Sequence, residues 1–324
     1  MTEGLSGSGE AQVVFHTSGS TGKSKDIVKS RRALELEVEM HRSMLSDILA
    51  DKPVFLSTID PTHMYGVLWR VMLPGISGCR VDPEVIISPE SLLGKMKAAG
   101  KVFLVTTPSF LSRFTAYADQ YEVPQNCVEV VTSGALLTEE VSRRTKEVFG
   151  IAPREIFGST ETGGVAWRRQ DEFSEWRVFG PVEVSSSDGR LEVRSPFSFM
   201  PVYVMGDGVD LAADRRSFRL LGRMDRLVKI NEERVNLAEM EEKIRALGYR
   251  DCALAVLDGD KGARLGLVIA GPKEGTLAVR AKMLKVFPKG TVPRRYRFVA
   301  EIPRNSQGKT VAAEMIRLLE GRDD

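Results

Sequence analysis

The sequence has few of the residues that disulfide frameworks and histidine-rich metal sites require. Its 324 residues include three cysteines and three histidines. Cys79, Cys127 and Cys252 are far apart and show no spacing typical of metal ligands, so we expect free or buried thiols in a reducing cytosol. So few histidines also argue against a histidine-rich metal site.

Long apolar runs and an excess of one charge are missing as well. No segment approaches the ~18 apolar residues of a membrane span, and the polar residues 1–10, rich in glycine and serine, do not form a signal peptide. The formal net charge of +2 is too small for a general nucleic-acid binder. The sequence therefore predicts a cytoplasmic protein with no membrane span and no nucleic-acid partner.

What is present is an alternation of strand and helix patterns. Residues 31–48 have apolar side chains at helical spacing, and 54–56 form a buried strand pattern. The patterns that follow predict strands at 79–81, 102–106, 128–132 and 154–157, and helices that run through 73 and over 89–98, 108–118 and 138–149. This alternation is typical of an α/β fold with right-handed βαβ units and a mainly parallel sheet.

The pattern changes after Glu161 and again near residue 225. Short strands separated by turn residues predict an antiparallel or barrel-like region at 176–179, 182–184, 191–193, 202–204 and 218–221. A smaller α+β unit follows, with predicted helices at 237–246, 276–286 and 311–320 and strands at 251–257, 265–270 and 296–299. We therefore expect a large domain over 1–225 and a small mobile domain over 226–324.

A loop of hydroxyls, glycines and lysines between a strand and an amphipathic helix suits a polyphosphate. The stretch reads Val13-Val14-Phe15-His16-Thr17-Ser18-Gly19-Ser20-Thr21-Gly22-Lys23-Ser24-Lys25. Glycines let successive backbone N–H groups point at an anion, hydroxyls add donors, and lysines add positive charge. The stretch therefore predicts a phosphate-binding loop.

Two other interpretations of this loop remain open. Gly22-Lys23-Ser24 matches the end of the P-loop pattern of kinases and NTPases, but the first glycine of that pattern would fall at Thr17. A flexible Ser/Gly linker is the second alternative, against which the strand before the loop and the helix behind it argue.

The loop resembles the phosphate loop of the acyl-adenylate-forming superfamily, T-S-G-[ST]-T-G-x-P-K. That superfamily includes acyl- and aryl-CoA synthetases, peptide-synthetase adenylation domains and luciferases. The matching residues are Thr17, Ser18, Gly19, Ser20, Thr21, Gly22 and Lys25. Ser24 replaces the usual proline, which would loosen the loop without removing a ligand. The resemblance implies that ATP is the cofactor and that this loop holds its pyrophosphate.

A second motif follows the strand at 154–157. Catalytic groups often lie on loops at the carboxyl ends of parallel strands, and here Thr160 could bind a phosphate and Glu161 could hold Mg²⁺. The segment resembles the family pattern x-Y-G-x-T-E, which implies nucleotide contacts from Phe157, Gly158 and Ser159. Phenylalanine replaces the tyrosine of the pattern, so stacking on adenine survives and the phenol's hydrogen bond is lost. A simple strand-to-loop turn is the alternative.

Two further resemblances concern the acid pocket. The turn that contains Ser133, Gly134 and Ala135 is similar to the family's small-residue turn along the acid and adenine pockets. His63 begins a segment, His63-Met64-Tyr65-Gly66, that resembles the H-x-x-G of acyl- and aryl-CoA synthetases, whose histidine faces the carboxylate. A tight turn and a structural histidine are the respective alternatives.

The nucleotide's sugar would be bound farther along the chain. Gly206-Asp207 resembles T-G-D, with Met205 in place of the threonine, and the Asp207 carboxylate could accept from both ribose hydroxyls. Asp210 competes for that role. The segment 222–230 matches G-R-x-D-x-x-V-K-I, in which Arg223 would reach ribose or phosphate. Asp225 would be the hinge of the small domain, or a turn carboxylate.

Near the C-terminus, Pro303-Arg304-Asn305-Ser306-Gln307-Gly308-Lys309 resembles P-[KR]-[TN]-x-x-G-K. The resemblance implies that Lys309 enters the site and bridges the acid's carboxylate and the α-phosphate, where negative charge gathers in the transition state. A solvated lysine before a helix is the alternative.

The family resemblance, which extends over residues 17–309, implies an AMP-forming acid–thiol ligase. An aryl or fatty acid would be adenylated with release of pyrophosphate and then transferred to the thiol of CoA or an acyl carrier protein. Two functions from other classes stay open: a non-catalytic nucleotide-binding remnant and a phosphotransferase that uses Gly22-Lys23-Ser24.

Two departures from the family pattern bear on this prediction. Glu232 replaces a glycine that in CoA ligases lets the pantetheine arm pass, which weakens the case for free CoA. The stretch before the phosphate loop is also much shorter than usual, which implies that the N-terminal subdomain is missing. The His63 helix and Glu232 together resemble the compact ligases of aryl-polyene and xanthomonadin-type pigment clusters.

Overall fold

Eleven strands pair into one sheet, in the order β11-β12-β13-β14-β10-β9-β8-β7-β6-β4-β5. The structure is a computed structural model and describes residues 3–5, 11–18, 24–231, 233–257, 262–304 and 310–321. The chain forms two compact units. The first includes Ser24–Met205 and Val209–Leu220, and the second includes Gly206–Gly208 and Leu221–Asp324.

Five neighbouring strands of the sheet are parallel, as the alternating pattern predicted. They are β4 (Val54–Ser57), β5 (Val81–Val85), β6 (Val102–Thr106), β7 (Cys127–Ser133) and β8 (Arg154–Ser159). The helices between them are α3 (Met64–Gly66), the π-helical η1 (Val67–Met72), α4 (Leu73–Ser77), α5 (Pro89–Ala98), α6 (Pro108–Ala116), the 3₁₀ turn η2 (Ala118–Gln120) and α7 (Glu139–Phe149). Ser88 and Thr138 cap the starts of α5 and α7 with their side-chain oxygens.

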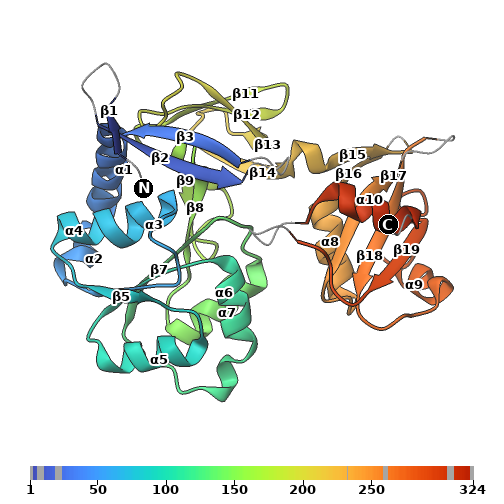
Figure 1. Cartoon of the computed structure of the whole chain (residues 1–324), viewed down its shortest axis with the longest axis horizontal. Coiled ribbons are helices and arrows are strands. Elements are labelled where there is room, and N and C mark those ends of the chain that lie inside the picture. Colours follow the sequence, from blue (N-terminus) through green and yellow to red (C-terminus); the bar gives the residue numbers. More distant parts are fainter. Residues whose placement is uncertain are drawn as a thin grey trace. The chain divides into compact units, whose positions relative to one another are not determined.

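Alternate side chains of these strands enter two separate cores. Phe55, Phe103 and Val131 pack in a cluster with α1, η1 and the antiparallel strands. Their chain neighbours Leu104 and Val130 pack in a second cluster with α5, α6 and α7. Because successive strand residues point to opposite faces, the sheet is covered by helices on both sides (Figure 1).

The rest of the sheet continues through an antiparallel pairing of β8 with β9, so the short strands are joined to the parallel part. They are β9 (Gly163–Arg168), β10 (Trp176–Val178), β11 (Glu183–Ser187), β12 (Arg190–Arg194), β13 (Tyr203–Leu211) and β14 (Ser217–Arg223). The predicted α/β class is confirmed. Strand β9, rich in glycine at its start, is an element that the sequence patterns did not reveal.

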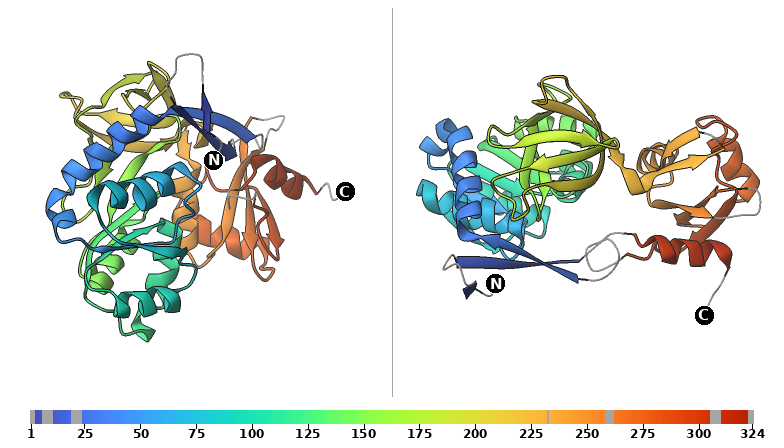
Figure 2. Two further views of the ribbon diagram at one scale, coloured as in Figure 1. Left: turned by 60° about the vertical axis from the view of Figure 1, so that its left-hand side comes forward. Right: turned by 90° about the horizontal axis from the view of Figure 1, so that it is seen from above.

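The N-terminal segment differs from the expected strand–loop–helix arrangement. Strands β1 (Glu3–Leu5), β2 (Ala11–Ser18) and β3 (Ser24–Ser30) form a separate sheet in the order β1-β2-β3. Strand β3 thus lies between the predicted phosphate loop and the helix, and Figure 2 shows the long strands of this hairpin in blue. The expected helix begins at α1 (Arg31–Met44), which Ser30 caps, and ends as α2 (Ser46–Ala50).

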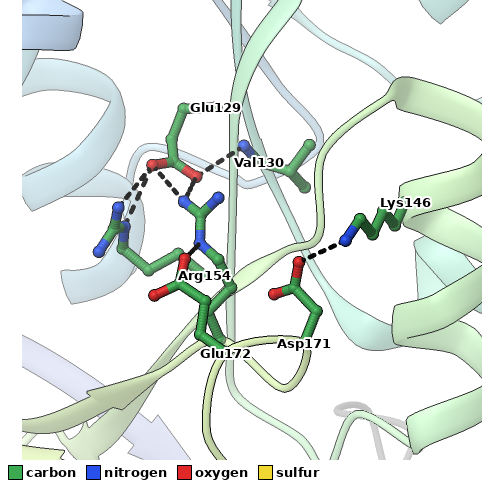
Figure 3. Close-up of polar contacts among 7 residues, drawn as sticks. Glu129, Val130, Lys146, Arg154, Asp171 and Glu172 are labelled. Atoms are coloured by element: carbon green, nitrogen blue, oxygen red, sulfur yellow. Dashed lines mark hydrogen bonds and ion pairs between the residues drawn. The ribbon is translucent and has the colours of Figure 1, made fainter.

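The amino ends of β7 and β8 are held by a buried cluster of charges (Figure 3). The Glu129 carboxylate is fully buried and accepts from Arg154 Nε and Nη2 at 3.1 and 3.0 Å and from Arg169 Nη2 at 2.8 Å. Its Oε1 atom also accepts from the backbone N–H of Val130 at 3.1 Å. Side-chain charges therefore neutralise one another at this end of the sheet.

The second unit has its own small sheet and cores. Its elements are the 3₁₀ turn η3 (Met224–Arg226), β15 (Leu227–Ile230), β16 (Glu233–Asn236), α8 (Leu237–Ala246), β17 (Cys252–Leu257), β18 (Arg264–Ala270), α9 (Thr276–Met283), β19 (Arg295–Val299) and α10 (Ala312–Glu320). Strands β17, β18 and β19 form a sheet with a core on each face. Leu254 belongs to one core and Val268 to the other. In the described part of the chain, none of the helices combines the length and apolar character that crossing a membrane requires.

Candidate active site

The carboxyl ends of β6, β7 and β8 bring several predicted site residues to one edge of the sheet. Ser133 is the last residue of β7, and its Oγ donates to the Ile156 carbonyl of β8 at 2.8 Å. Gly134, with a φ of +90°, and Ala135 follow in an exposed turn. The small-residue turn after β7 therefore lies next to the strand that carries Phe157.

The turn between β8 and β9 presents Thr160 and Glu161 at its tip. Its base is closed by two hydroxyls: the Ser159 N–H donates to Thr162 Oγ1 at 3.1 Å, and the Thr162 N–H donates to Ser159 Oγ at 3.2 Å. A Cβ atom at Gly158 would lie 2.2 Å from the Gly163 carbonyl oxygen, so the two strands approach closely only because glycine stands there. Thr160 and Glu161 are both half-buried.

Lys29 of β3 ties the N-terminal hairpin to this turn. Its side chain is fully buried, and its Nζ atom donates to the Glu161 carbonyl at 3.0 Å and to the Phe197 carbonyl at 2.5 Å. Burial lowers the pKa of Lys29 from 10.5 to about 8, and the charges of Glu37 and Glu161 act in the opposite direction. The strand that leaves the predicted phosphate loop therefore contacts the main chain of the predicted metal ligand.

Phe157 lies on β8 with its ring against the antiparallel part of the core. The ring centroid is 5.4 Å from that of Trp176 and 5.7 Å from that of Phe218. The residue is half-buried, so core contacts hold the ring in place. Stacking of this ring on adenine stays a prediction.

The His63 segment also reaches the carboxyl edge of the parallel strands. Exposed His63 precedes α3, and the Tyr65 hydroxyl donates to the carbonyls of Val131 at 3.0 Å and Thr106 at 3.3 Å. Burial raises the pKa of Tyr65 well above its ordinary value, so it remains a donor at neutral pH. A Cβ atom at Gly66 would lie 2.1 Å from the Asp60 carbonyl oxygen, which explains the glycine.

The predicted phosphate loop lies partly outside the described residues. Thr17 and Ser18 end β2, and exposed Lys25 is in β3. Across the hairpin, His16 Nδ1 is 2.6 Å from Asp26 Oδ1. Gly19, Ser20, Thr21 and Gly22 are among the residues that the structure does not describe.

In the second unit, the predicted ribose ligands lie near one another. Arg223 Nη1 is 3.8 Å from Asp207 Oδ2, and a Cβ atom at Gly206 would lie 2.7 Å from Arg223 Cζ. Glycine therefore lets the guanidinium lie against the main chain that leads into Asp207. The competing Asp210 is exposed on β13.

Three further residues of the prediction lie in or beyond the start of the second unit. Asp225 lies in η3, and its hinge role stays a prediction. Glu232 and Lys309 lie outside the described residues. An isolated antiparallel bridge pairs Arg304 with Thr310, on either side of 305–309.

The oxygen donors of the β8–β9 turn fit a Mg²⁺ ion that is held mainly by a nucleotide. Among the described residues, no group of three or more His, Cys, Asp and Glu side chains could hold a metal. Mg²⁺ usually keeps several waters and takes one or two carboxylates together with substrate phosphates. Glu161, at the tip of the turn beside Thr160, offers one such carboxylate.

Sequence reasoning missed four residues of this region. Thr162 and Tyr65 stand inside motifs in which other residues carry the predicted roles. Lys29 gave no signal because lysine side chains usually face solvent. Glu37 did give a signal, because this charged residue stands on the apolar face of α1, among Leu34 and other buried residues at helical spacing. Its carboxylate Oε1 accepts from the Gly164 N–H at 2.6 Å.

Comparisons with known proteins identify the family of this chain. The family model described as AMP-binding enzyme matches residues 7–193, more than half of the chain. The 4-coumarate–CoA ligase of Cereibacter sphaeroides is 28% identical over 309 residues, covering 93% of this chain and 70% of that protein. The 3,4-dihydroxybenzoate–[aryl-carrier protein] ligase of Bacillus anthracis is 21% identical, covering 93% of this chain and 72% of that protein.

Solved structures share the fold. The o-succinylbenzoate CoA synthetase (MenE) of Bacillus subtilis, in complex with its acyl-adenylate intermediate, superposes with a TM-score of 0.82 at 14% identity, covering 96% of this chain and 69% of that chain. ATP-bound MatB from Rhodopseudomonas palustris gives 0.77 at 21% identity, covering 96% and 68%. The chain belongs to the AMP-binding enzyme family, within the acyl-adenylate-forming superfamily, and is an enzyme of the AMP-forming acid–thiol ligase type.

Proposed function

We propose that this protein uses ATP to adenylate an aryl or fatty acid, releases pyrophosphate, and transfers the acyl group to a thiol. The observation that carries the proposal is the contact of Lys29, four residues beyond Lys25, with the main chain of Glu161. It joins the strand leaving the phosphate-loop motif to the turn with the metal-ligand motif. The turn lies at the carboxyl edge of the parallel strands, where ligands bind in open α/β folds.

The chemistry requires a carboxylate to approach a polyphosphate, so the enzyme must supply positive charge and positioning more than acid–base catalysis. We assign pyrophosphate binding to the loop from Thr17 to Lys25. Asp207 and Arg223 would orient the ribose. Lys309 would neutralise the charge that develops between the acid and the α-phosphate.

Adenine and metal would be bound by the segment around β8. Phe157 would stack on the base beside Gly158 and Ser159, and Thr160 would donate to a phosphate. Bound Mg²⁺ would neutralise charge on the phosphate oxygens, and Glu161 would hold it. The hydroxyl pair that closes the turn would keep the Glu161 carboxylate directed at the nucleotide.

The acid would lie beside the small-residue turn, Ser133, Gly134 and Ala135, with its carboxylate toward His63. An aryl acid is supported by the names of two relatives, which specify 4-coumarate and 3,4-dihydroxybenzoate. The same names include both CoA and a carrier protein as acceptors. We also propose a cytoplasmic location, supported by three cysteines that are all free thiols.

The test is acid-dependent exchange of labelled pyrophosphate into ATP across benzoates, cinnamates and fatty acids. We expect exchange with one class of acid, its loss in Lys309→Ala, and its retention in Lys289→Ala, which removes an exposed lysine of the same unit. Adding CoA or an acyl carrier protein then identifies the acceptor. ATP binding without exchange for any acid would instead indicate a nucleotide-binding remnant, and formation of ADP would indicate a phosphotransferase.

A further inference from the structure

Two buried charged side chains lie beneath the turn that carries Glu161. The Lys29 side chain on β3 is 0% exposed and that of Glu37 on α1 is 2% exposed. Charged residues are seldom buried so fully unless they bind something specific. Both of these bind main-chain groups of the same turn.

The two side chains hold the turn at opposite ends. The Lys29 ammonium donates to the Glu161 carbonyl at 3.0 Å and links it to the Phe197 carbonyl. The Glu37 carboxylate accepts from the Gly164 N–H at 2.6 Å. Hydrogen bonds to an ionised partner are roughly twice as strong as neutral ones, so the backbone from 161 to 164 is held firmly.

The glycines of the turn fit the Glu37 side chain. A Cβ atom at Gly163 would lie 2.5 Å from Glu37 Oε2, and one at Gly164 would lie 3.2 Å from Glu37 Oε1. The buried His41 ring lies behind, with Nε2 3.9 Å from Glu37 Oε1 and its centroid 4.3 Å from that of Trp69. The carboxylate therefore has a defined position from which it fixes the turn.

We propose that Lys29 and Glu37 are positioning residues that hold the turn 161–164 so that the Glu161 carboxylate meets the Mg²⁺ of the bound nucleotide. The inference rests on the proposed function in one respect, the role of Glu161 as metal ligand. Neither side chain touches substrate in this assignment. Both act through the main chain of the turn.

The first test compares ATP affinity with saturating Mg²⁺ and with EDTA in Lys29→Met, which removes the ammonium and keeps an unbranched chain. Mutating a residue that hydrogen-bonds to a metal ligand typically lowers metal affinity about 10–100-fold. We expect MgATP affinity to fall at least tenfold and metal-free ATP affinity to be unchanged. Lys29→Arg keeps the cation and should restore part of the MgATP affinity.

The matched control is Arg154→Met, which removes a largely buried cation, 11% exposed, from the opposite end of β8. Arg154 contacts Glu129 and not the β8–β9 turn. The Arg154→Met variant should have a lower thermal midpoint of unfolding but the wild-type ratio of MgATP affinity to metal-free ATP affinity. A fall in MgATP affinity of the same size in Arg154→Met would assign the effect to general destabilisation and overturn the proposal.

A double-mutant cycle tests whether Lys29 acts on MgATP binding through the Glu161 carboxylate. In a Glu161→Gln background, Lys29→Met should weaken MgATP binding no further, because the carboxylate that it positions is gone. Glu37→Leu should behave as Lys29→Met does, and Glu37→Gln, which keeps an oxygen for the Gly164 N–H, should lie closer to wild type. Full additivity with Glu161→Gln would overturn the positioning role.

The outcome separates this inference from the proposed function. MgATP binding that depends on Lys29, without acid-dependent exchange, would support positioning and overturn adenylation. Exchange in the wild type together with unchanged MgATP affinity in Lys29→Met would support adenylation and overturn the positioning role of Lys29. Absence of any nucleotide binding would overturn both.

Discussion

The two ends of strands β7 and β8 bury charge in opposite ways. At the amino end, both oxygens of Glu129 are bound by the guanidinium groups of Arg154 and Arg169, so side chains pair with side chains (Figure 3). At the carboxyl end, Lys29 donates to main-chain carbonyls and Glu37 accepts from a main-chain N–H. The first arrangement joins strands to one another. The second fixes the path of a single turn.

The completeness of the pairing differs too. Within the described part of the chain, three buried atoms near the turn have no hydrogen-bond partner: Glu37 Oε2 and both ring nitrogens of His41. In the Glu129 cluster only Arg169 Nε is in that state, and both carboxylate oxygens of Glu129 are bound. A buried polar atom without a partner costs free energy. Such costs persist where a backbone must be held for another purpose, which is what the carboxyl edge of this sheet is proposed to do.

The largest expected effect comes from breaking the amino end. Glu129→Gln leaves the buried Arg169 and the largely buried Arg154 without their carboxylate. Removing one partner of a buried pair costs about 3–5 kcal/mol. Denaturant unfolding should show this loss, while MgATP affinity changes little. Asp171→Asn is the control, because the more exposed pair that Asp171 forms with Lys146 at 2.9 Å contributes less than about 1 kcal/mol.

Cys127 gives this prediction a second readout. Burial raises the pKa of its thiol to about 12, so at neutral pH nearly all of it is protonated and alkylation of the native protein should be slow. The thiol lies 3.4 Å from the Glu129 carbonyl. Alkylation that is faster in Glu129→Gln than in wild type would report opening of the amino end, and equal rates would contradict it.

At the carboxyl end, Glu161→Gln is expected to do the opposite of Glu129→Gln: it should lower activity and leave stability nearly unchanged. Removing the proposed metal ligand should lower the rate of pyrophosphate exchange by about 10²–10³-fold, the usual effect of losing one charge-stabilising group. The free energy of unfolding should stay near the wild-type value, because the side chain is half-buried at the tip of a turn. Exchange at the normal rate would show that the metal is held elsewhere.

Gly163→Ala should lower both the free energy of unfolding and the affinity for MgATP. Each effect should be smaller than that of Glu129→Gln on stability or of Glu161→Gln on exchange. Gly163 has a φ of +72°, and an added Cβ atom would lie 2.5 Å from Glu37 Oε2 and 2.7 Å from Phe197 Cβ. We expect a loss of about 1–3 kcal/mol in unfolding free energy and weaker MgATP binding.

Gly189→Ala is the matched control for that variant. Gly189 has a φ of +76° with nothing within 4 Å of the added Cβ atom, so it carries the backbone strain without the contact with Glu37. Equal losses of stability in the two variants, with MgATP binding unaffected in both, would mean that the fit between Glu37 and the glycines has no effect of its own.

Much of the fold could be predicted from the sequence. Helices α5 and α7 were located to within a residue, because proline, serine and threonine mark their starts and apolar periodicity marks their length. Strand β3 was missed because polar residues surround its short apolar centre, Ile27 and Val28, so its pattern resembles a loop. Pairing with β2 makes it a strand, and pairing is a tertiary property.

For the candidate site, the sequence by itself determined the motifs and their order, and with them the family, because each motif is a local run of residues with its own chemistry. Only the tertiary structure decided that Lys29 and Glu37 lie under the Glu161 turn. A lysine in a strand and a glutamate in a helix are ordinary in sequence. Their roles come from burial against a backbone more than 120 residues away in the chain, the contact of Glu37 with Gly164 having a separation of 127 residues. Such long-range contacts follow from packing of the whole unit, and no local pattern encodes them.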